Sequence, residues 1–250
     1  MSEIFRWSFS QWESYDQCPA KWRYQSVLRL PRKPAGPAAK RGTHLHDRAE
    51  AYIKGEIDAG NLLIGDPNFK EEDEGFQQAT IHPRYLHILD EFRLHPNGDR
   101  HTELKLGFDS EWNLVPDNHP QASCIMVLDA VRAGGSWAGS EKGADSGLVR
   151  IGEWKSGKPK DSHPEQRKMY ALAGFKKWMA DVVEVTTFYL EDTAPPAKLE
   201  VQASALPRLI EIWDERRRLM VRDEICAPRP GQYCRWCDYA ASKGGPCKMG

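Results

Sequence analysis

The sequence predicts an α/β fold in which helices flank a mixed central β-sheet. Three observations support this: polar and apolar residues alternate over residues 103–112, short apolar runs follow at 124–131, 148–155 and 182–190, and helical patterns lie around them. The connections between the first three strands are too short for a crossover helix, so these strands should pair antiparallel. The fourth strand follows a helix and should lie parallel to a neighbour.

The first hundred residues predict a helical region. Ser10 and Glu13 have the spacing of a capping box, which predicts a helix that ends near Cys18 because a proline follows. Residues 20–30 predict a second helical piece rich in aromatic side chains, and residues 31–37 predict a proline-rich loop.

The next segment predicts two helices separated by an insertion. Thr43 is a candidate N-cap for a helix that continues to about residue 54. Residues 55–77 are acidic and contain glycine and proline, so we expect an irregular insertion there. A helix over residues 78–94 follows, with Pro83 near its start.

The second half of the chain alternates between strands, loops and helices. Residues 134–147 are rich in glycine and serine and predict a loop. Ser162 and Glu165 have the spacing of a second capping box, which predicts a helix over residues 162–180. A serine at the start of residues 204–222 predicts the cap of a last helix, followed by a cysteine-rich tail.

Composition argues against a membrane or secreted protein. Hydrophobic residues make up 40% of the chain, but no apolar run approaches the roughly 18 residues that a membrane helix needs. The N-terminus has no secretory pattern, so we expect a soluble, cytoplasmic protein without a membrane partner. Disulfides are rare in that compartment, so the six cysteines indicate metal or redox chemistry.

The formal net charge of −1 gives no indication of a nucleic-acid partner, but the basic residues are clustered. Each cluster could be an ordinary solvated surface or a phosphate-binding patch, and the sequence does not separate these two readings. The two clusters comprise Arg29, Arg32, Lys33, Lys40 and Arg41 near the N-terminus, and Arg208, Arg216, Arg217, Arg218, Arg222, Arg229 and Arg235 near the C-terminus.

Three polar residues on neighbouring strands form a candidate catalytic group. Asp129 lies inside an apolar strand, where an ionised carboxylate is costly unless it is paired or bound to metal. Glu153 and Lys155 are two apart on the next strand and therefore project from the same face. Two carboxylates can hold Mg²⁺ or Mn²⁺, and a lysine beside them can stabilise developing negative charge during phosphodiester hydrolysis.

Two helical pairs could add to this group. Gln166 and Tyr170 are spaced i, i+4 and could contact DNA, although an ordinary amphipathic surface would show the same spacing. His46 and Glu50 have the same spacing on an earlier helix. The imidazole of His46 could add a nitrogen ligand to a metal, or it could be a surface histidine.

Together these residues form a motif series that resembles the RecB-like nucleases of the PD-(D/E)xK superfamily. The series reads Arg41-Gly42-Thr43-x-x-His46-x-x-x-Glu50, Asp129, Glu153-x-Lys155 and Gln166-x-x-x-Tyr170. The resemblance implies a restriction-endonuclease-like core and a single nuclease domain over residues 1–250. Its parts would be a helical region at 1–100, a catalytic core at 101–192 and a terminal helix with a cluster-binding tail at 193–250.

The resemblance also implies roles for individual residues. His46, Asp129 and Glu153 would ligate the metal together with the backbone carbonyl of Trp154, and Lys155 would be catalytic. Two further residue pairs complete the assignment, namely Gln166 and Tyr170 as DNA contacts, and Glu50 and Glu103 as supporting residues.

The tail contains a second candidate metal site. Cys234-x-x-Cys237 and Cys247 supply three thiolates, and a fourth would complete a tetrahedral set. Cys18 is the best candidate for the fourth ligand, and Cys226 is the alternative. Spacing alone does not distinguish Zn²⁺ from a [4Fe–4S] cluster.

The same resemblance favours iron over zinc. One branch of the family, which includes AddB and nucleases of CRISPR adaptation, joins an N-terminal Cys-Pro to a C-terminal cysteine group through a [4Fe–4S] cluster. The remaining cysteine, Cys124, lies in a strand and should be a small buried residue.

These expectations combine into a Mg²⁺- or Mn²⁺-dependent DNA exonuclease, with 5′→3′ polarity implied by the resemblance. Its substrates would be single strands or duplex ends, in recombination or end processing, with a recombination or single-strand-binding protein as a partner. Several small members of the family are viral. The alternatives are a structure-specific endonuclease, a trimming nuclease of CRISPR adaptation, and a non-catalytic DNA-binding subunit that carries the cluster.

Overall fold

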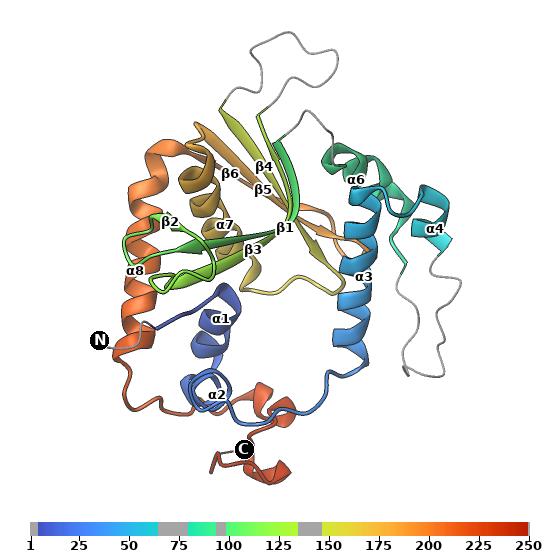
Figure 1. The fold of residues 1–250 in the computed structure, drawn as a ribbon. Helices are drawn as coiled ribbons and strands as arrows, with labels where there is room; N and C mark the ends of the chain where they lie inside the picture. Colours follow the sequence, from blue (N-terminus) through green and yellow to red (C-terminus); the bar gives the residue numbers. More distant parts are fainter. Residues whose placement is uncertain (1–4, 65–79, 94–98, 135–146, 250) are drawn as a thin grey trace.

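The computed structural model describes residues 5–64, 80–93, 99–134 and 147–249 (Figure 1). Its centre is a six-stranded sheet in the order β2-β1-β3-β4-β5-β6. The strands are β1 (Asp99–Phe108), β2 (Leu114–Val115), β3 (Cys124–Ala133), β4 (Leu148–Lys155), β5 (Val182–Tyr189) and β6 (Ala197–Gln202).

The predicted mixed topology is confirmed. The β1–β3 and β3–β4 pairs are antiparallel, whereas β5 lies parallel to β4 and is reached through helix α7 (His163–Trp178). The edge strands β2 and β6 were not predicted. They are short or exposed, so neither carries the buried apolar run that marked the central strands.

Helices cover both faces of the sheet and enclose two apolar cores (Figure 1). One core lies beneath α1 (Phe9–Gln17), α7 and α8 (Leu206–Arg222). The other lies beneath α3 (Pro37–Lys54) and α6 (Leu86–Phe92). Strand alternation explains the division, because Ile151 packs into the first core and Trp154 into the second.

Both predicted capping boxes are wrong for one reason. Helix α1 begins at Phe9 with Ser8 as its N-cap, and the carboxylate of Glu13 accepts a hydrogen bond from the Ser162 hydroxyl at 2.5 Å. Ser162 is the N-cap residue of α7, as expected, but its side chain does not cap that helix. The two polar side chains therefore join α1 to the start of α7 instead of capping their own helices.

The helix with the His46 motif begins earlier than predicted. Pro37 occupies the first turn of α3, a position where its missing N–H costs nothing, and Thr43 lies inside the helix rather than at its cap. The helix ends at Lys54, as predicted, and Gly55 follows with φ 79°, a conformation that favours glycine.

Three other segments of the helical region differ from the sequence predictions in extent. Residues 20–30 form α2 (Pro19–Trp22) and a π-helical turn (Arg23–Val27). The expected irregular insertion contains helix α4 (Ala59–Ile64), while residues 65–79 lie outside the described part of the chain. A 3₁₀ turn (Pro83–Tyr85) leads into α6, which is shorter than expected.

The predicted loop at residues 134–147 falls mostly on residues 135–146, which are outside the described part. The last predicted helix is confirmed as α8, but the predicted serine cap is wrong, because Ser204 lies in a preceding 3₁₀ turn (Ala203–Ala205) and Ala205 is the N-cap residue. Among the described helices, none combines the length and apolar character needed to cross a membrane.

Candidate functional site

Asp129 lies where strands β3 and β4 separate. Their ladder runs from Ala133–Val149 to Ala130–Gly152, and the next polar contact is a hydrogen bond from the Trp154 N–H to the Asp129 carboxylate at 2.7 Å. Burial raises the pKa of Asp129 well above its usual value, and the nearby Glu153 carboxylate raises it further. The strand geometry thus holds a carboxylate in a position where it cannot easily stay charged without a cation.

A local irregularity places Glu103 beside Asp129. Strands β1 and β3 pair on both sides of these two residues but not at them, and Glu103 has φ 49°, which is unusual for a residue other than glycine. The side-chain alternation of β3 also changes phase here: Leu128 and Val131 both pack into the core beneath α7. Such backbone strain occurs at functional sites when the surrounding structure maintains it.

This irregularity in β1 and β3 brings three potential ligands together. His46, Glu103 and Asp129 each offer one atom, and these atoms all lie within 4.8 Å of one another. Burial raises the pKa of Glu103, and the carboxylates of Glu50 and Glu153 raise it further. The sequence suggested Glu103 only as a supporting residue, whereas the geometry makes it a candidate ligand.

Glu153 and Lys155 project from the same face of β4, as predicted. One oxygen of Glu153 accepts hydrogen bonds from Lys155 and, at 2.8 Å, from the Gln166 amide. The other oxygen, Oε2, is buried, and among the described residues none donates a hydrogen bond to it. Burial lowers the pKa of Lys155, but the neighbouring Glu153 and Asp129 carboxylates outweigh it and the pKa is raised.

His46 reaches the carboxylates from α3. Its Nδ1 lies 3.6 Å from the Asp129 carboxylate, and burial lowers its pKa, which favours the neutral form that ligates metals. Arg41 forms an ion pair with Glu191 and so fastens the same helix to the end of the sheet. A Cβ on Gly42 would lie 3.0 Å from the hydroxyl of Ser156, so glycine permits the close approach of α3.

The predicted DNA contacts Gln166 and Tyr170 are both largely buried. The Gln166 amide donates to Glu153 and, at 2.9 Å, to the Tyr170 hydroxyl. Tyr170 is 6% exposed and belongs to the core beneath α7, although it also lines the cavity described below. These contacts orient Glu153, and a direct role in DNA binding stays a prediction.

Glu50 occupies the periphery of the site. Its carboxylate forms an ion pair with Lys54 at 2.6 Å, one helical turn along α3. Among the described residues it is not part of the close ligand group, but its charge raises the pKa of Glu103. A supporting electrostatic role is therefore compatible with this position.

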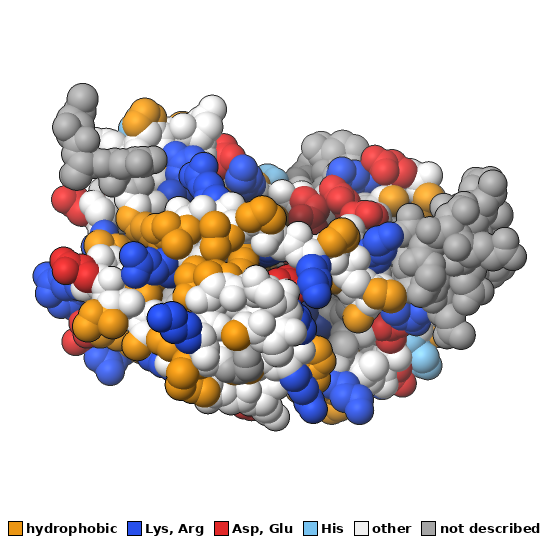
Figure 2. Space-filling view, turned by 90° about the horizontal axis from the view of Figure 1, so that it is seen from below, with side chains coloured by type: hydrophobic (Ala, Val, Ile, Leu, Met, Phe, Trp, Pro, Cys, Tyr) orange, Lys and Arg blue, Asp and Glu red, His pale blue; other side chains and the backbone are white. Residues whose placement is uncertain are grey.

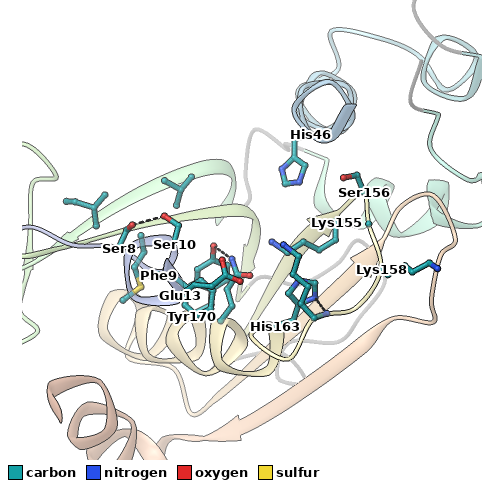
Figure 3. Close-up of a pocket in the computed structure, with 16 residues that line it drawn as sticks. Ser8, Phe9, Ser10, Glu13, His46, Lys155, Ser156, Lys158, His163 and Tyr170 are labelled. Carbon is teal, nitrogen blue, oxygen red and sulfur yellow. Dashed lines mark hydrogen bonds between the residues drawn. The ribbon is translucent and has the colours of Figure 1, made fainter. Parts of the chain in front are cut away.

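A cavity of about 450 Å³ opens in front of Lys155 (Figure 3). It lies between α1, α3, α7 and the segment that follows β4, and its wall contains more cationic than anionic side chains. The sequence interpretation missed four of the polar residues that line it, namely Glu13, Lys158, Lys160 and His163. The three lysines in Lys155-Ser156-Gly157-Lys158-Pro159-Lys160 were a signal that could have indicated this wall.

The four cysteines proposed as cluster ligands converge on a second cavity. Cys18, at the junction of α1 and α2, lines it together with Cys234, Cys237 and Cys247 from the tail. The backbone N–H of Arg229 approaches the sulfur of Cys18 at 3.5 Å. That of Gly231 approaches the sulfur of Cys234 at 3.4 Å.

The two remaining cysteines lie elsewhere. Cys226, the alternative fourth ligand, does not line this cavity; its thiol donates to the backbone carbonyl of Asp223 at 3.0 Å. Cys124 is buried in β3, as predicted. Within the described chain, the geometry therefore favours Cys18 over Cys226 as the fourth member of the group.

The C-terminal arginines are largely engaged with acidic neighbours. Arg216 contacts Glu165 at 2.5 Å and stacks on the rings of Trp12 and Trp213. Three others form ion pairs within α8, namely Arg208, Arg217 and Arg218. On the face that Figure 2 shows, Lys and Arg side chains are scattered among hydrophobic ones and do not form one continuous stripe.

Comparison with known protein families finds a match over part of the chain. Residues 6–105 match the family model for the PD-(D/E)XK nuclease superfamily. The matched region carries His46 and Glu103 and ends before Asp129, Glu153 and Lys155. The mixed sheet with flanking helices is consistent with the fold of that superfamily.

The solved structures that match this chain include two of low sequence identity. A crystal structure of SSO0001 is 14% identical with a TM-score of 0.45, covering 100% of this chain and 90% of that chain. A "Putative exonuclease" from Eubacterium rectale is 9% identical with a TM-score of 0.47, covering 99% of this chain and 90% of that chain. No curated protein matches the chain.

Proposed function

We propose that the protein is a divalent-metal-dependent deoxyribonuclease that uses the group around Asp129. The main observation behind this proposal is the buried Oε2 of Glu153, to which no residue in the described part of the chain donates a hydrogen bond; Glu153 lies on the strand next to Asp129 and beside Lys155. A buried carboxylate oxygen without a donor is costly, and a cation would satisfy it. The donor set of carboxylates and one imidazole suits Mg²⁺ or Mn²⁺.

The residues present divide into ligands and supporting groups. His46, Asp129 and Glu153 would hold the metal, with the Trp154 carbonyl as implied by the resemblance and Glu103 as an addition from the geometry. When bound, the metal supplies a water of lowered pKa and neutralises charge on the phosphate. No iron or zinc is needed at this site, because oxygen ligands predominate.

The protein's own groups would position the reaction. Lys155 remains protonated because of its carboxylate neighbours, so its ammonium can donate to the attacking water or to the developing charge on the phosphate. Gln166 holds one oxygen of Glu153 and leaves the other free. The Arg41–Glu191 ion pair fixes α3 and with it the ring of His46.

We infer an exonuclease rather than an endonuclease, with the strand entering the 450 Å³ cavity past Lys158 and Lys160. The support for end-dependence and for 5′→3′ polarity is the family resemblance. The ion pairs of Arg208, Arg216, Arg217 and Arg218 make the lysines of the cavity better candidates for phosphate contact. A cytoplasmic role in recombination or end processing, with a single-strand-binding partner, belongs to the same proposal.

The cysteine cavity would hold a [4Fe–4S] cluster that joins the tail to α1 and α2, with Zn²⁺ as the alternative. Four cysteines that line one cavity, two of them with a sulfur approached by a backbone N–H group, support a metal site. We expect a structural role, because the cavity is separate from the one in front of Lys155 and shares no lining residue with it.

The decisive experiment compares linear and circular DNA. End-labelled single-stranded and double-stranded oligonucleotides are incubated with Mn²⁺, beside a circular single strand and a Lys155→Ala control. Early release of short products from a 5′ label, with an intact circle, would support the full proposal. Steady shortening from the 3′ end would reverse the polarity, and cutting of the circle would identify an endonuclease. DNA binding without any cleavage would favour a non-catalytic subunit.

A further inference from the structure

His163 has no part in the mechanism above, yet it lines the cavity in front of Lys155 (Figure 3). It is the first residue of α7 and is only 5% exposed. Its ring stacks on Tyr189 with centroids 5.9 Å apart and an interplanar angle of 28°. Buried polar groups normally have hydrogen-bond partners, so each of the two ring nitrogens of His163 should have one.

The first nitrogen, Nδ1, is occupied. It lies 3.0 Å from the hydroxyl of Tyr189 and 3.4 Å from the backbone N–H of Lys160. A backbone N–H can only donate, so Nδ1 must be the acceptor and must carry no proton. The Tyr189 hydroxyl then also donates to Nδ1, and the proton of the neutral ring resides on Nε2.

The second nitrogen, Nε2, makes no hydrogen bond within the described chain and is not sealed from the cavity. Burial, together with the positive charges of Lys155 and Lys160, lowers the pKa of His163 to about 4. The ring is therefore neutral at pH 7, and Nε2 presents one N–H donor of fixed direction. Such a donor matches an anionic oxygen in a site that excludes water.

We propose that His163 Nε2–H binds a non-bridging oxygen of the phosphate next to the scissile one, and that Tyr189 positions the ring for this contact. This inference rests on the proposed nuclease function. The scissile phosphate itself is assigned to Lys155 and the metal ligands, while His163 lines the same cavity as Lys158 and Lys160 and lies beside the backbone of Lys160. One fixed neutral donor would set the register of the strand without competing for the metal.

Three variants separate a specific contact from simple packing. His163→Ala removes the donor, and His163→Gln places an amide N–H near the position of Nε2. Tyr189→Phe keeps the buried ring but removes the hydroxyl that donates to Nδ1. His87→Ala, at an exposed histidine on α6, is the matched control. Melting temperatures of all four proteins would establish that they are folded.

We expect His163→Ala to lower kcat/KM about ten- to hundredfold, the range for one lost hydrogen bond to a charged group. His163→Gln should recover most of this loss, Tyr189→Phe should lose a smaller part of it, and His87→Ala should behave as wild type. Equal activity of His163→Ala and wild type would overturn the proposal. Equal losses in the alanine and glutamine variants would indicate packing and would also overturn it.

Substrates with one methylphosphonate group identify the phosphate. Replacing the contacted phosphate should slow the wild type and have little additional effect on His163→Ala, whereas other positions should affect both proteins equally. Equal sensitivity at every position would contradict a specific contact.

Binding of the same DNAs separates this inference from the proposed function. A Lys155→Ala protein with His163→Ala or His163→Gln added is titrated with single-stranded DNA. The contact is supported if the glutamine form binds DNA more tightly than the alanine form and this difference disappears on methylphosphonate DNA. This result would hold even if the wild type cleaved no DNA. Identical affinities would reject the contact even if cleavage were robust.

Discussion

The carboxylate site lies where strands of one sheet meet, whereas the cysteine cavity joins the two ends of the chain. Asp129 and Glu153 are held by β3 and β4, and hydrogen bonds from Trp154 and Gln166 fix their carboxylates. In the cysteine cavity, Cys18 meets a tail whose described helices are short 3₁₀ turns. We therefore expect the first site to persist without metal and the second to need its metal for order.

The two sites also differ in what metal loss would leave behind. At the carboxylate site, loss of the cation leaves buried negative charge, so the metal-free protein should be strained but folded. At the cysteine cavity, loss of the metal leaves four cysteine side chains without the ion or cluster that would join them. The first site should thus govern activity and pH dependence, and the second should govern the attachment of the tail.

The largest effect should come from breaking the carboxylate site. Asp129→Ala, Glu153→Ala and Lys155→Ala should each reduce cleavage by roughly 10³-fold or more, because the first two remove a metal ligand and the third removes the ammonium that stabilises charge on the phosphate. DNA binding, measured by fluorescence anisotropy, should change only a few-fold. Lys177→Ala, at an exposed residue of α7, is the control. Substantial cleavage by Lys155→Ala would show that the site is wrongly assigned.

Replacing a cysteine of the cysteine cavity should affect the stability of the protein more than its cleavage of DNA. Cys18→Ser should release the tail metal and lower the melting temperature by roughly 5–15 °C, since metal binding contributes folding energy. Cys226→Ser should retain the metal, because its thiol lies outside the cavity and a hydroxyl can replace its hydrogen bond to Asp223.

Metal analysis of anaerobically purified protein sharpens the same comparison. About four irons per chain and a brown colour would match one [4Fe–4S] cluster. Colourless protein with one zinc would keep the four-cysteine site and replace the cluster. A Cys18 variant with its full metal content would point back to Cys226.

A third test uses the raised pKa of Asp129. Between its unfolded and folded pKa values, the metal-free native state binds more protons than the unfolded state, so stability falls as pH rises through that window. Asp129→Asn should remove this dependence and stabilise the metal-free protein at neutral pH by roughly 1–3 kcal/mol, while abolishing cleavage. Urea denaturation in EDTA at pH 5 and pH 8 would measure it. If the free energy of unfolding changes with pH in the same way in the wild type and in Asp129→Asn, Asp129 is not the group that causes this pH dependence.

The smallest effect should distinguish two roles for Tyr170. Tyr170→Phe keeps the ring and removes the hydroxyl bonded to Gln166, so a loss of a few-fold in kcat would indicate an orienting role. If the ring stacks on a base, Tyr170→Ala should weaken substrate binding by about 1–3 kcal/mol, whereas Tyr170→Phe should bind normally. Separate measurement of kcat and KM decides between them.

The sequence by itself determined the central strands and the residues that lie close together along them. Glu153 and Lys155 share a face because side chains alternate along a strand, and Asp129 stands out because an apolar strand rarely contains a carboxylate. The order of antiparallel and parallel pairs followed from connection lengths in the same way. These properties depend on neighbours in the chain, so local pattern was sufficient to predict them.

Only the tertiary structure decided how distant segments complete the sites. The irregularity at Glu103, the Glu13–Ser162 hydrogen bond, and the position of Cys18 beside the tail cysteines each depend on a partner far away in sequence. His163 likewise gains a fixed tautomer from Tyr189, which belongs to another strand. A serine that would cap an isolated helix can bond to a remote carboxylate instead, because packing brings the better acceptor within reach, and no local pattern records that competition.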